Sequence, residues 1–320
     1  MARHSDTDPE QNLAIRAAWL HYVGGMKQGA VAKRLGIPSV KAHRLIARAV
    51  TEGAVKVTID GEIVECVELE ERLCRRYGLD MCEVAPDLGE EGLPLRALGL
   101  AGADFLRRQI ESGEHAVIGL GHGRTLAAAV QQLPRVVANG VCFVSLLGGL
   151  TRNYAANPHD VMHRLAEKTG ARAFVLPVPF FANSDRDRAV LLSQPGVPEL
   201  FAMANGAGLQ FVGIGTADAG AQLVASSMIE PREIAEINAA GGTGEMLGHF
   251  FDASGRVLET TLTARTLAVD LDGPPGSRSA GRIVAIAGGA QKVAAVRAVL
   301  ESGRLKGLIT DEQTARTLIG

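Results

Sequence analysis

The chain has 320 residues, 47% of them hydrophobic, which is enough to bury a core in one large and one small domain. No apolar run approaches the roughly 20 residues that span a membrane, and the opening MARHSDTDPEQN lacks an apolar signal segment. We therefore expect a soluble, cytoplasmic protein without a membrane partner. The four cysteines are Cys66, Cys74, Cys82 and Cys142. They form no CxxC pair and have no histidine at zinc-like spacing, so we expect reduced thiols and no metal site.

The charge is uneven along the chain, although the net charge is only −2. Residues 27–56 carry seven Lys and Arg side chains against Glu52 alone, so this window is +6 and the rest of the chain is −8. A basic segment on a mildly acidic protein favours contact with a polyanion such as double-stranded DNA. A solvated helix face is the alternative.

The N-terminal residues predict three helices. Residues 11–23 form the first, in which Trp19 and its apolar neighbours are available for a core. The second is expected over 28–35 and the third over 39–52, with Ser39 as its N-cap. Two short helices joined by a tight Gly-containing turn are typical of a helix-turn-helix, whose second helix lies in the major groove.

The third predicted helix has a packing side and a cationic side. Its apolar residues recur at helical spacing, as Ala42, Leu45, Ile46 and Ala49. Lys41, Arg44 and Arg48 follow the same spacing on the other side, where they can contact phosphates and base edges. The residues expected to contact DNA are Gln28, Lys33, Ser39, Lys41, His43, Arg44 and Arg48. Two-helix hairpins also occur in proteins that bind no DNA, and a lone His43 could simply be exposed.

The following segment predicts a junction between two domains. Residues 55–67 alternate in polarity around Asp60 and Gly61, as expected for a β-hairpin that forms a wing or a connector. We therefore expect a helix-turn-helix domain, with or without a wing, over 1–60. A larger domain for effector binding and oligomerisation is expected over 61–320.

Beyond a helix expected over 68–77, apolar strands alternate with helices, which predicts an α/β fold with a doubly wound, mainly parallel sheet. The expected strands are 115–120, 141–147, 171–176, 209–214, 282–287 and 307–309, and the helices include 95–110, 125–133, 161–169 and 291–300. Ligands bind such sheets at the carboxyl ends of the strands. The loops that follow strands are therefore the candidate site.

The first of these loops, residues 119–125, runs from a strand into a helix. The free N–H groups of that helix, together with Arg124 and Thr125, could hold an anion. The loop is neither GxGxxG nor a Walker A sequence, so no dinucleotide or ATP cofactor is indicated. Glycines that only permit a tight turn are the alternative.

Later loops offer groups that suit a polyhydroxylated or phosphorylated ligand. Thr151 and Arg152 follow one strand, and Asp218 and Glu245 provide carboxylates for sugar hydroxyls. Lys292 lies in the first turn of an expected helix, where a cation is disfavoured unless an anion lies beside it. A lysine that faces solvent is the alternative.

Six stretches of the sequence, in this order, resemble the SorC family of bacterial sugar-binding transcription regulators. They are AAWLHYVGGMKQGAVAKRLGI (17–37), GLGHGRTLAAAV (119–130), LLGGL (146–150), VGIGTAD (212–218), GEMLGHFFDASG (244–255) and GGAQKVAAVRAVLESGRLKGLITDEQTA (288–315). The segment RLGIPSVKAHRLIARAV further resembles the erythritol regulators of α-proteobacteria, which control polyol catabolism.

The resemblance implies an effector-controlled repressor or activator that assembles as a tetramer. Its large domain would be similar in fold to sugar-phosphate isomerases but would sense a sugar, a polyol or its phosphate. The effector-binding residues implied are Gly121, His122, Gly123, Arg124, Thr125, Gly148, Gly149, Thr151, Arg152, Asp218, Glu245 and Lys292. Among these, Lys292 matches the family's anchoring lysine. The family often has Trp at the position of His122 and a different turn at 38–43, so effector and operator are expected to differ.

Two other functions are compatible with these residues. A sugar-phosphate isomerase-like enzyme with an added DNA-binding unit would use Asp218, Glu245 and His249 as acid or base. Alternatively, the large domain could only oligomerise, without a ligand. The regulator is favoured over the enzyme because the spacing does not show that the three side chains converge.

Overall fold

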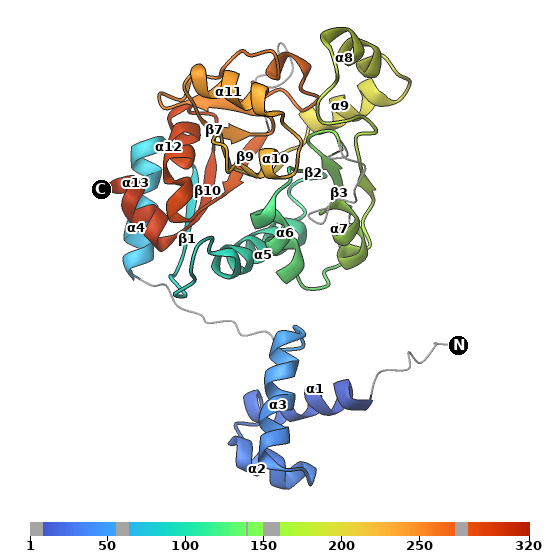
Figure 1. Ribbon diagram of the computed structural model, residues 1–320. Coiled ribbons are helices and arrows are strands. Elements are labelled where there is room, and N and C mark those ends of the chain that lie inside the picture. Colours follow the sequence, from blue (N-terminus) through green and yellow to red (C-terminus); the bar gives the residue numbers. More distant parts are fainter. Residues whose placement is uncertain (1–8, 56–63, 139, 150–160, 273–280) are drawn as a thin grey trace. The chain divides into compact units, whose positions relative to one another are not determined.

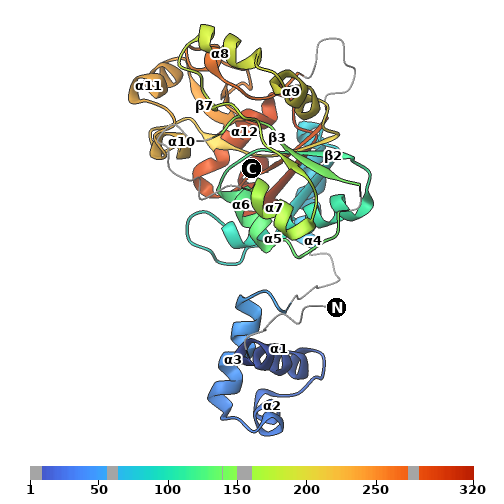
Figure 2. The ribbon, with the colours of Figure 1, turned by 90° about the vertical axis from the view of Figure 1, so that its right-hand side faces the viewer.

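The computed structural model describes residues 9–55, 64–138, 140–149, 161–272 and 281–320. The chain divides into two compact units between Gly61 and Glu62 (Figures 1 and 2). Among the described helices, none is both long and apolar enough to cross a membrane.

The small unit is a bundle of three helices, α1 (Pro9–Tyr22), α2 (Gln28–Leu35) and α3 (Ser39–Thr51). Its core is built from Ala14, Ala17, Ala18, Leu20, Val31, Leu45, Ile46 and Ala49. Gly36 is the C-cap of α2, and Pro38 rather than Ser39 occupies the N-cap of α3. The helix-turn-helix prediction is confirmed, with both helices within one residue of the expected bounds.

The place of Trp19 differs from the prediction. This side chain is 58% exposed, and it is joined on the outer side of α1 by the exposed Ile15 and Tyr22. The small residues Ala14 and Ala17 face the core instead, because only short side chains let α1 approach α3 closely.

The predicted hairpin over 55–67 is partly wrong. Residues 56–63 lie outside the described residues, but α4 (Val64–Tyr77) already begins within the second predicted arm. Cys66, Leu69 and Leu73 are buried at intervals of three and four residues. This spacing is that of a helix, so the segment is helical although its apolar and polar residues alternate as in a strand.

The large unit continues through alternating elements. The strands are β1 (Met81–Ala85), β2 (Val117–Leu120), β3 (Cys142–Ser145), β4 (Ala173–Phe174), β5 (Leu209–Gly213), β6 (Gly215–Thr216), β7 (Gly242–Met246), β8 (His249–Asp252), β9 (Arg282–Ile286) and β10 (Gly307–Asp311). The helices after α4 are α5 (Leu95–Ser112), α6 (Arg124–Gln132), α7 (Met162–Thr169), α8 (Asp185–Leu192), α9 (Val197–Asn205), α10 (Gln222–Ala225), α11 (Pro231–Ala239), α12 (Val293–Glu301) and α13 (Glu312–Ile319), with 3-10 turns η1 (Thr263–Arg265) and η2 (Ala290–Lys292).

Seven strands form one parallel sheet in the order β1-β10-β9-β5-β2-β3-β4. Strand β1 forms one edge of the sheet. From β2 the chain moves outward through β3 to β4 at the other edge, and then returns to the other side of β2 at β5. This reversal between β2 and β5 is the point at which open α/β sheets form a ligand crevice. The predicted doubly wound sheet is confirmed.

Both faces of this sheet are buried. Alternate residues of one strand enter different cores: Phe211 packs on the α5, α6 and α7 side, whereas Val212 packs on the side of α9, α12 and α13. In Figure 1, α4 and α13 lie side by side at the β1 edge. A sheet covered on both faces explains why its strands read as continuous apolar runs.

Two parts of the sheet structure were not predicted. Strand β1 has Glu83 at its centre and is only partly buried at Met81 and Glu83, so it does not read as a continuous apolar run, and it is recognised only by its pairing with β10. A second, antiparallel sheet has the order β6-β7-β8 and includes Glu245, which the sequence placed in a loop.

Candidate functional site

A pocket of about 360 Å³ lies at the carboxyl ends of β2, β5 and β9, beside the point where the strand order reverses. This volume is within the range of small-molecule sites. Its lining residues are Gly92, Leu93, His122, Gly123, Arg124, Thr125, Gly213, Ile214, Gly215, Thr216, Asp218, Gly220, Gln222, Leu223, Glu245, Leu247, Gly289, Gln291 and Lys292. Five segments that are distant in the sequence, 92–93, 122–125, 213–223, 245–247 and 289–292, thus form one site.

The loop after β2 places the N-terminus of α6, the positive end of its dipole, beside the pocket. Gly123 is the N-cap of α6 with φ of 120°, a conformation that side-chain-bearing residues rarely adopt. Arg124 follows as the first residue of the helix. The hydroxyl of Thr125 donates to the carbonyl oxygen of Ile286 on β9, 3.1 Å away, and so ties this loop to the sheet. Arg124 and the N–H groups of the first turn are therefore available to an anion.

Lys292 enters the same pocket from the loop after β9. Its Nζ donates to the carbonyl oxygen of Ile214, 2.6 Å away, and an ammonium group has further donors to offer a ligand. The loop is held by the N–H of Gly289, which donates to Asp311 and to Thr314, each at 2.8 Å. The backbone of Gly289 also has positive φ, 95°. Lys292 is therefore positioned by both the sheet and α13.

Glu245 provides the acidic side of the pocket. Strand β7 pairs with β6 so that Glu245 lies opposite Gly215. The carboxylate is buried, and its Oε1 accepts a hydrogen bond of 2.6 Å from the N–H of Gly248. A carboxylate here can accept hydrogen bonds from ligand hydroxyls.

The two charged side chains have shifted pKa values. Burial raises the pKa of Glu245 to about 7, an effect that the Gly248 N–H and Lys292 partly oppose. Burial also lowers the pKa of Lys292 to about 8, with repulsion from Arg124 acting in the same direction and Glu245 opposing it. An anion placed beside Lys292 and Arg124 would offset this repulsion.

We expect the affinity for a phosphorylated ligand to fall as the pH rises from 7 to 9. Glu245 gains a negative charge through its pKa of about 7, and Lys292 loses a positive charge through its pKa of about 8. Both changes oppose an anion, whose own second ionisation is complete because its pKa is about 6. Above pH 8 the loss approaches about tenfold per pH unit, measurable by titration calorimetry. An affinity that is constant or rises over this range would contradict a site in which Lys292 and Glu245 face the phosphate. A non-phosphorylated ligand serves as the control.

The other predicted effector residues are distributed differently. Asp218 lies at the exposed rim, with its carboxylate accepting from the N–H of Gly220. Gly121 is buried behind the lining residues. The N–H groups of Gly148 and Gly149 bond to backbone carbonyls and do not reach the pocket. Two further predicted residues, Thr151 and Arg152, lie outside the described residues.

The acid-base set considered for an enzyme does not converge. Asp218 and Glu245 line the pocket, but His249 does not, and its Nε2 bonds to the carbonyl oxygen of Val269 at 3.1 Å. Burial lowers the pKa of His249. This histidine therefore has a structural partner rather than access to a ligand.

Several lining residues were missed by the sequence interpretation. Leu93 reaches the pocket from the segment before α5, and Thr216, Gln222 and Leu247 come from the part around the small sheet. Thr216 and Leu247 lie within the stretches 212–218 and 244–255 that resemble the family, but neither was assigned to the site, and no motif marks Leu93 or Gln222. The pairing of β6 with β7 brings the segments of Thr216 and Leu247 together.

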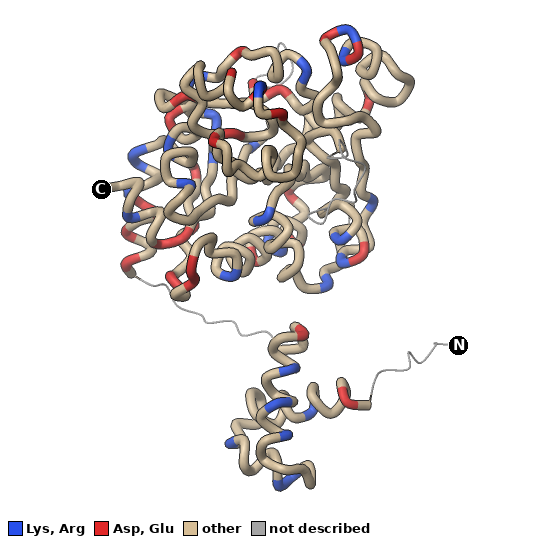
Figure 3. The backbone as a smooth tube through the Cα atoms, in the orientation of Figure 1, with Lys and Arg blue, Asp and Glu red and all other residues tan. Residues whose placement is uncertain are grey.

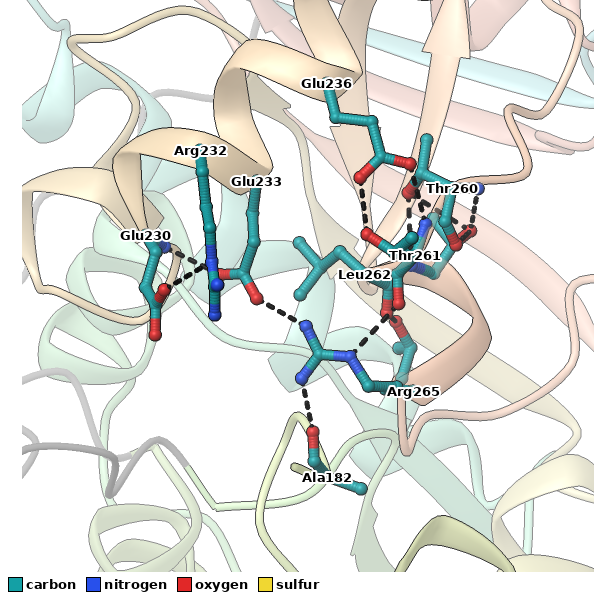
Figure 4. Close-up of polar contacts among 11 residues, drawn as sticks. Ala182, Glu230, Arg232, Glu233, Glu236, Thr260, Thr261, Leu262 and Arg265 are labelled. Atoms are coloured by element: carbon teal, nitrogen blue, oxygen red, sulfur yellow. Dashed lines mark hydrogen bonds and ion pairs between the residues drawn. The ribbon is translucent and has the colours of Figure 1, made fainter. Parts of the chain in front are cut away.

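A buried ion pair fixes the helix that precedes β7 (Figure 4). Glu233 on α11 pairs with Arg265, and their side chains are 4% and 14% exposed. The second carboxylate oxygen of Glu233 accepts from the N–H of Glu230 at 2.7 Å. Arg265 also donates to the carbonyl oxygen of Ala182, 2.6 Å away. The pair thereby joins α11 to two other segments of the large unit.

The exposed side of α3 is the candidate DNA-contacting surface. The small unit carries seven Lys and Arg side chains against Glu10 and Glu52 over the residues 9–55 (Figure 3). The Nδ1 of His43 donates to Oε1 of Gln28, 3.1 Å away, which connects the two helices of the motif. Arg44 is exposed, and its Nη2 lies 3.9 Å from Oε1 of Glu10. Of the other predicted residues, Lys33 and Ser39 are exposed and Lys41 is half-buried.

Arg48 is more constrained than the sequence suggests. It forms ion pairs with Glu52 at 2.6 Å and with Glu10 at 3.1 Å. These carboxylates compete with any DNA phosphate for the guanidinium group. A phosphate contact by Arg48 stays a prediction.

The chain is similar to a family model and to several known proteins over most of its length. Residues 61–320 match the family model described as "Putative sugar-binding domain". The chain is 67% identical over 313 residues to the erythritol catabolism regulatory protein EryD of Brucella abortus, covering 98% of each chain. It is 30% identical to the transcriptional regulator LsrR of Klebsiella pneumoniae, covering 97% of this chain and 93% of that protein.

Solved structures show the same fold. The full-length sorbitol operon regulator SorC from Klebsiella pneumoniae matches with a TM-score of 0.70 at 24% identity, covering 98% of this chain and all of that one. A DeoR family transcriptional regulator from Listeria monocytogenes matches with a TM-score of 0.71 at 20% identity, covering 79% of this chain and 99% of that one.

Proposed function

Because this chain belongs to the SorC family of sugar-binding transcription regulators, we propose that residues 1–60 bind operator DNA and residues 61–320 sense the effector. The regulated operon serves the catabolism of a sugar or polyol. The observation that carries the sensing part is the meeting of Arg124, Lys292 and Glu245 in one pocket. Effector binding changes the affinity for the operator by favouring one of two states of the large domain.

The chemistry of the pocket favours a phosphorylated polyol. Arg124, Lys292 and the first turn of α6 suit a phosphate, while Glu245 and Asp218 suit hydroxyl groups. The relative EryD is named for erythritol catabolism. We therefore propose that the effector is a phosphorylated four-carbon polyol derived from erythritol.

The test measures operator affinity in the presence of candidate effectors. The full-length protein first selects its binding sequence from a randomised duplex pool, and the dissociation constant is then measured with erythritol, with erythritol phosphate and with no addition. A shift with the phosphate that erythritol does not produce supports the proposal. Sequence-specific binding that no sugar, polyol or phosphate changes would support a large domain that only oligomerises.

Paired recognition helices require at least two copies of the chain, and we propose a tetramer. A dimer of helix-turn-helix units places its helices about one DNA turn apart, roughly 34 Å. Light scattering of the purified protein, alone and with the selected duplex, measures the number of copies.

We expect Arg44→Ala to relax the specificity of DNA binding. Arg44 is exposed on α3, and an Arg that contacts a guanine in two places contributes about 1–3 kcal/mol of discrimination. Arg48→Ala should instead weaken all sequences alike, since a guanidinium group that leaves Glu10 and Glu52 for a phosphate neutralises the DNA backbone without reading a base. Affinities for the selected duplex and for a scrambled one distinguish these outcomes. Equal specificity ratios for the two variants would contradict the division of roles.

A further inference from the structure

The second residue of α3 has a side chain that the fold of the small unit does not use. Val40 is 81% exposed, and it is not among the residues packed in the core of this unit. The buried side of α3 is already supplied by Ala42, Leu45 and Ile46. A large aliphatic side chain therefore stands in solvent at the start of the helix that, under the proposed function, enters the major groove.

The neighbours of Val40 on α3 define the surface that would meet base pairs. His43 and Arg44 are exposed three and four residues later, and Ala47 is exposed at the seventh. This spacing puts all four on one side of a helix. Two apolar side chains, Val40 and Ala47, therefore flank the polar pair His43 and Arg44.

An apolar side chain in the major groove has one matching partner among the bases. The C5-methyl of thymine is the only methyl group displayed there, and aliphatic side chains recognise it by contact. The rise of α3 between Val40 and Arg44 is about 6 Å, which corresponds to roughly two base-pair steps of 3.4 Å. A contact of Val40 is therefore expected within about two base pairs of that of Arg44.

We propose that Val40 reads the C5-methyl of a thymine in each operator half-site, within about two base pairs of the base pair contacted by Arg44. This inference rests on the proposed DNA-binding function and adds the identity of one base. It makes Val40 a specificity-determining residue that the basic pattern of the motif does not reveal. Substitution of an exposed residue leaves the core intact, so its effect can be measured on a folded protein.

The experiment removes the methyl group from the DNA rather than only the side chain from the protein. Each thymine of the selected duplex is replaced in turn by deoxyuridine, which pairs with adenine but lacks the methyl group. One position in each half-site should lose about fourfold in affinity for the unmodified protein, as expected when one methyl group is no longer buried. Val40→Ala should bind the thymine duplex about as weakly as the unmodified protein binds the deoxyuridine duplex. Its affinity should not change when deoxyuridine replaces thymine at that position.

Val50→Ala provides the matched control, because Val50 is an exposed valine in the last turn of the same helix. This variant should keep the full response to deoxyuridine. Circular dichroism melting verifies that both variants fold. The inference is overturned if no thymine near the Arg44-dependent base pair responds, or if Val40→Ala keeps the response. A failure to select any duplex would overturn the proposed DNA-binding function together with this inference. If a duplex is selected but its thymine methyl groups have no effect, only the inference about Val40 is overturned.

Discussion

Lys292→Met is expected to abolish the thermal stabilisation of the protein by a phosphorylated polyol. The substitution keeps the length of the side chain but removes the ammonium group that donates to Ile214 and faces the pocket. Loss of one partner from a desolvated charge pair costs about 2–5 kcal/mol, which corresponds to a loss in affinity of about 30-fold to several thousand-fold. A thermal-shift titration measures it, since a ligand that binds only the folded state raises the melting temperature.

The matched control is Lys306→Met, in which an exposed lysine outside the pocket loses its charge. This variant should respond to the ligand as the unmodified protein does. Undiminished stabilisation of Lys292→Met by the phosphorylated compound would refute an anchoring role for Lys292. If erythritol itself stabilises both variants equally, the effector is a neutral polyol, and the phosphate assignment falls.

Arg265→Ala is expected to lower the free energy of unfolding of the large unit by about 3–5 kcal/mol. The substitution leaves the carboxylate of Glu233 buried without its cationic partner, and breaking a buried ion pair from one side has a cost of this size. It also removes the hydrogen bond to the carbonyl oxygen of Ala182. The melting temperature should fall on the order of 10 °C, measured by calorimetry without ligand.

The same cluster contains its own control. Arg232 forms an exposed ion pair of 2.8 Å with Glu230, and exposed pairs contribute about 1 kcal/mol or less. Arg232→Ala should therefore have little effect. Adding Glu233→Gln to Arg265→Ala should recover part of the stability, because the amide oxygen can still accept from the N–H of Glu230 without a buried charge. Similar losses for Arg232→Ala and Arg265→Ala would refute the role of the buried pair.

Local patterns were sufficient for the helix-turn-helix and for most of the parallel sheet. The spacing of Ala42, Leu45 and Ala49 defines α3 because a helix repeats its buried side every three to four residues. Strand β5 is recognisable because both of its faces are buried, which gives a continuous apolar run. These signals lie within one element, so the sequence alone contains them.

The same local signals failed wherever a distant partner decides the structure. Strand β1 exists because it pairs with β10 more than 200 residues away, and Trp19 is exposed because Ala14, Ala17, Ala18 and Leu20 already form the side of α1 that packs in the core. The prediction of a β-hairpin is wrong from Val64 onward, because this segment is a helix with one buried face. Contacts between elements override local propensity in each case.

Sequence by itself determined which chemical groups are available for the candidate site: the Gly-rich turn with Arg124, the carboxylate of Glu245 and the amine of Lys292. Only the tertiary structure decided that these three line one pocket while Gly148 and Gly149 do not. The reason is topological. Parallel strands bring the loops at their carboxyl ends to one edge, but which of these loops enclose a cavity depends on where the strand order reverses and on the antiparallel pairing of β6 with β7.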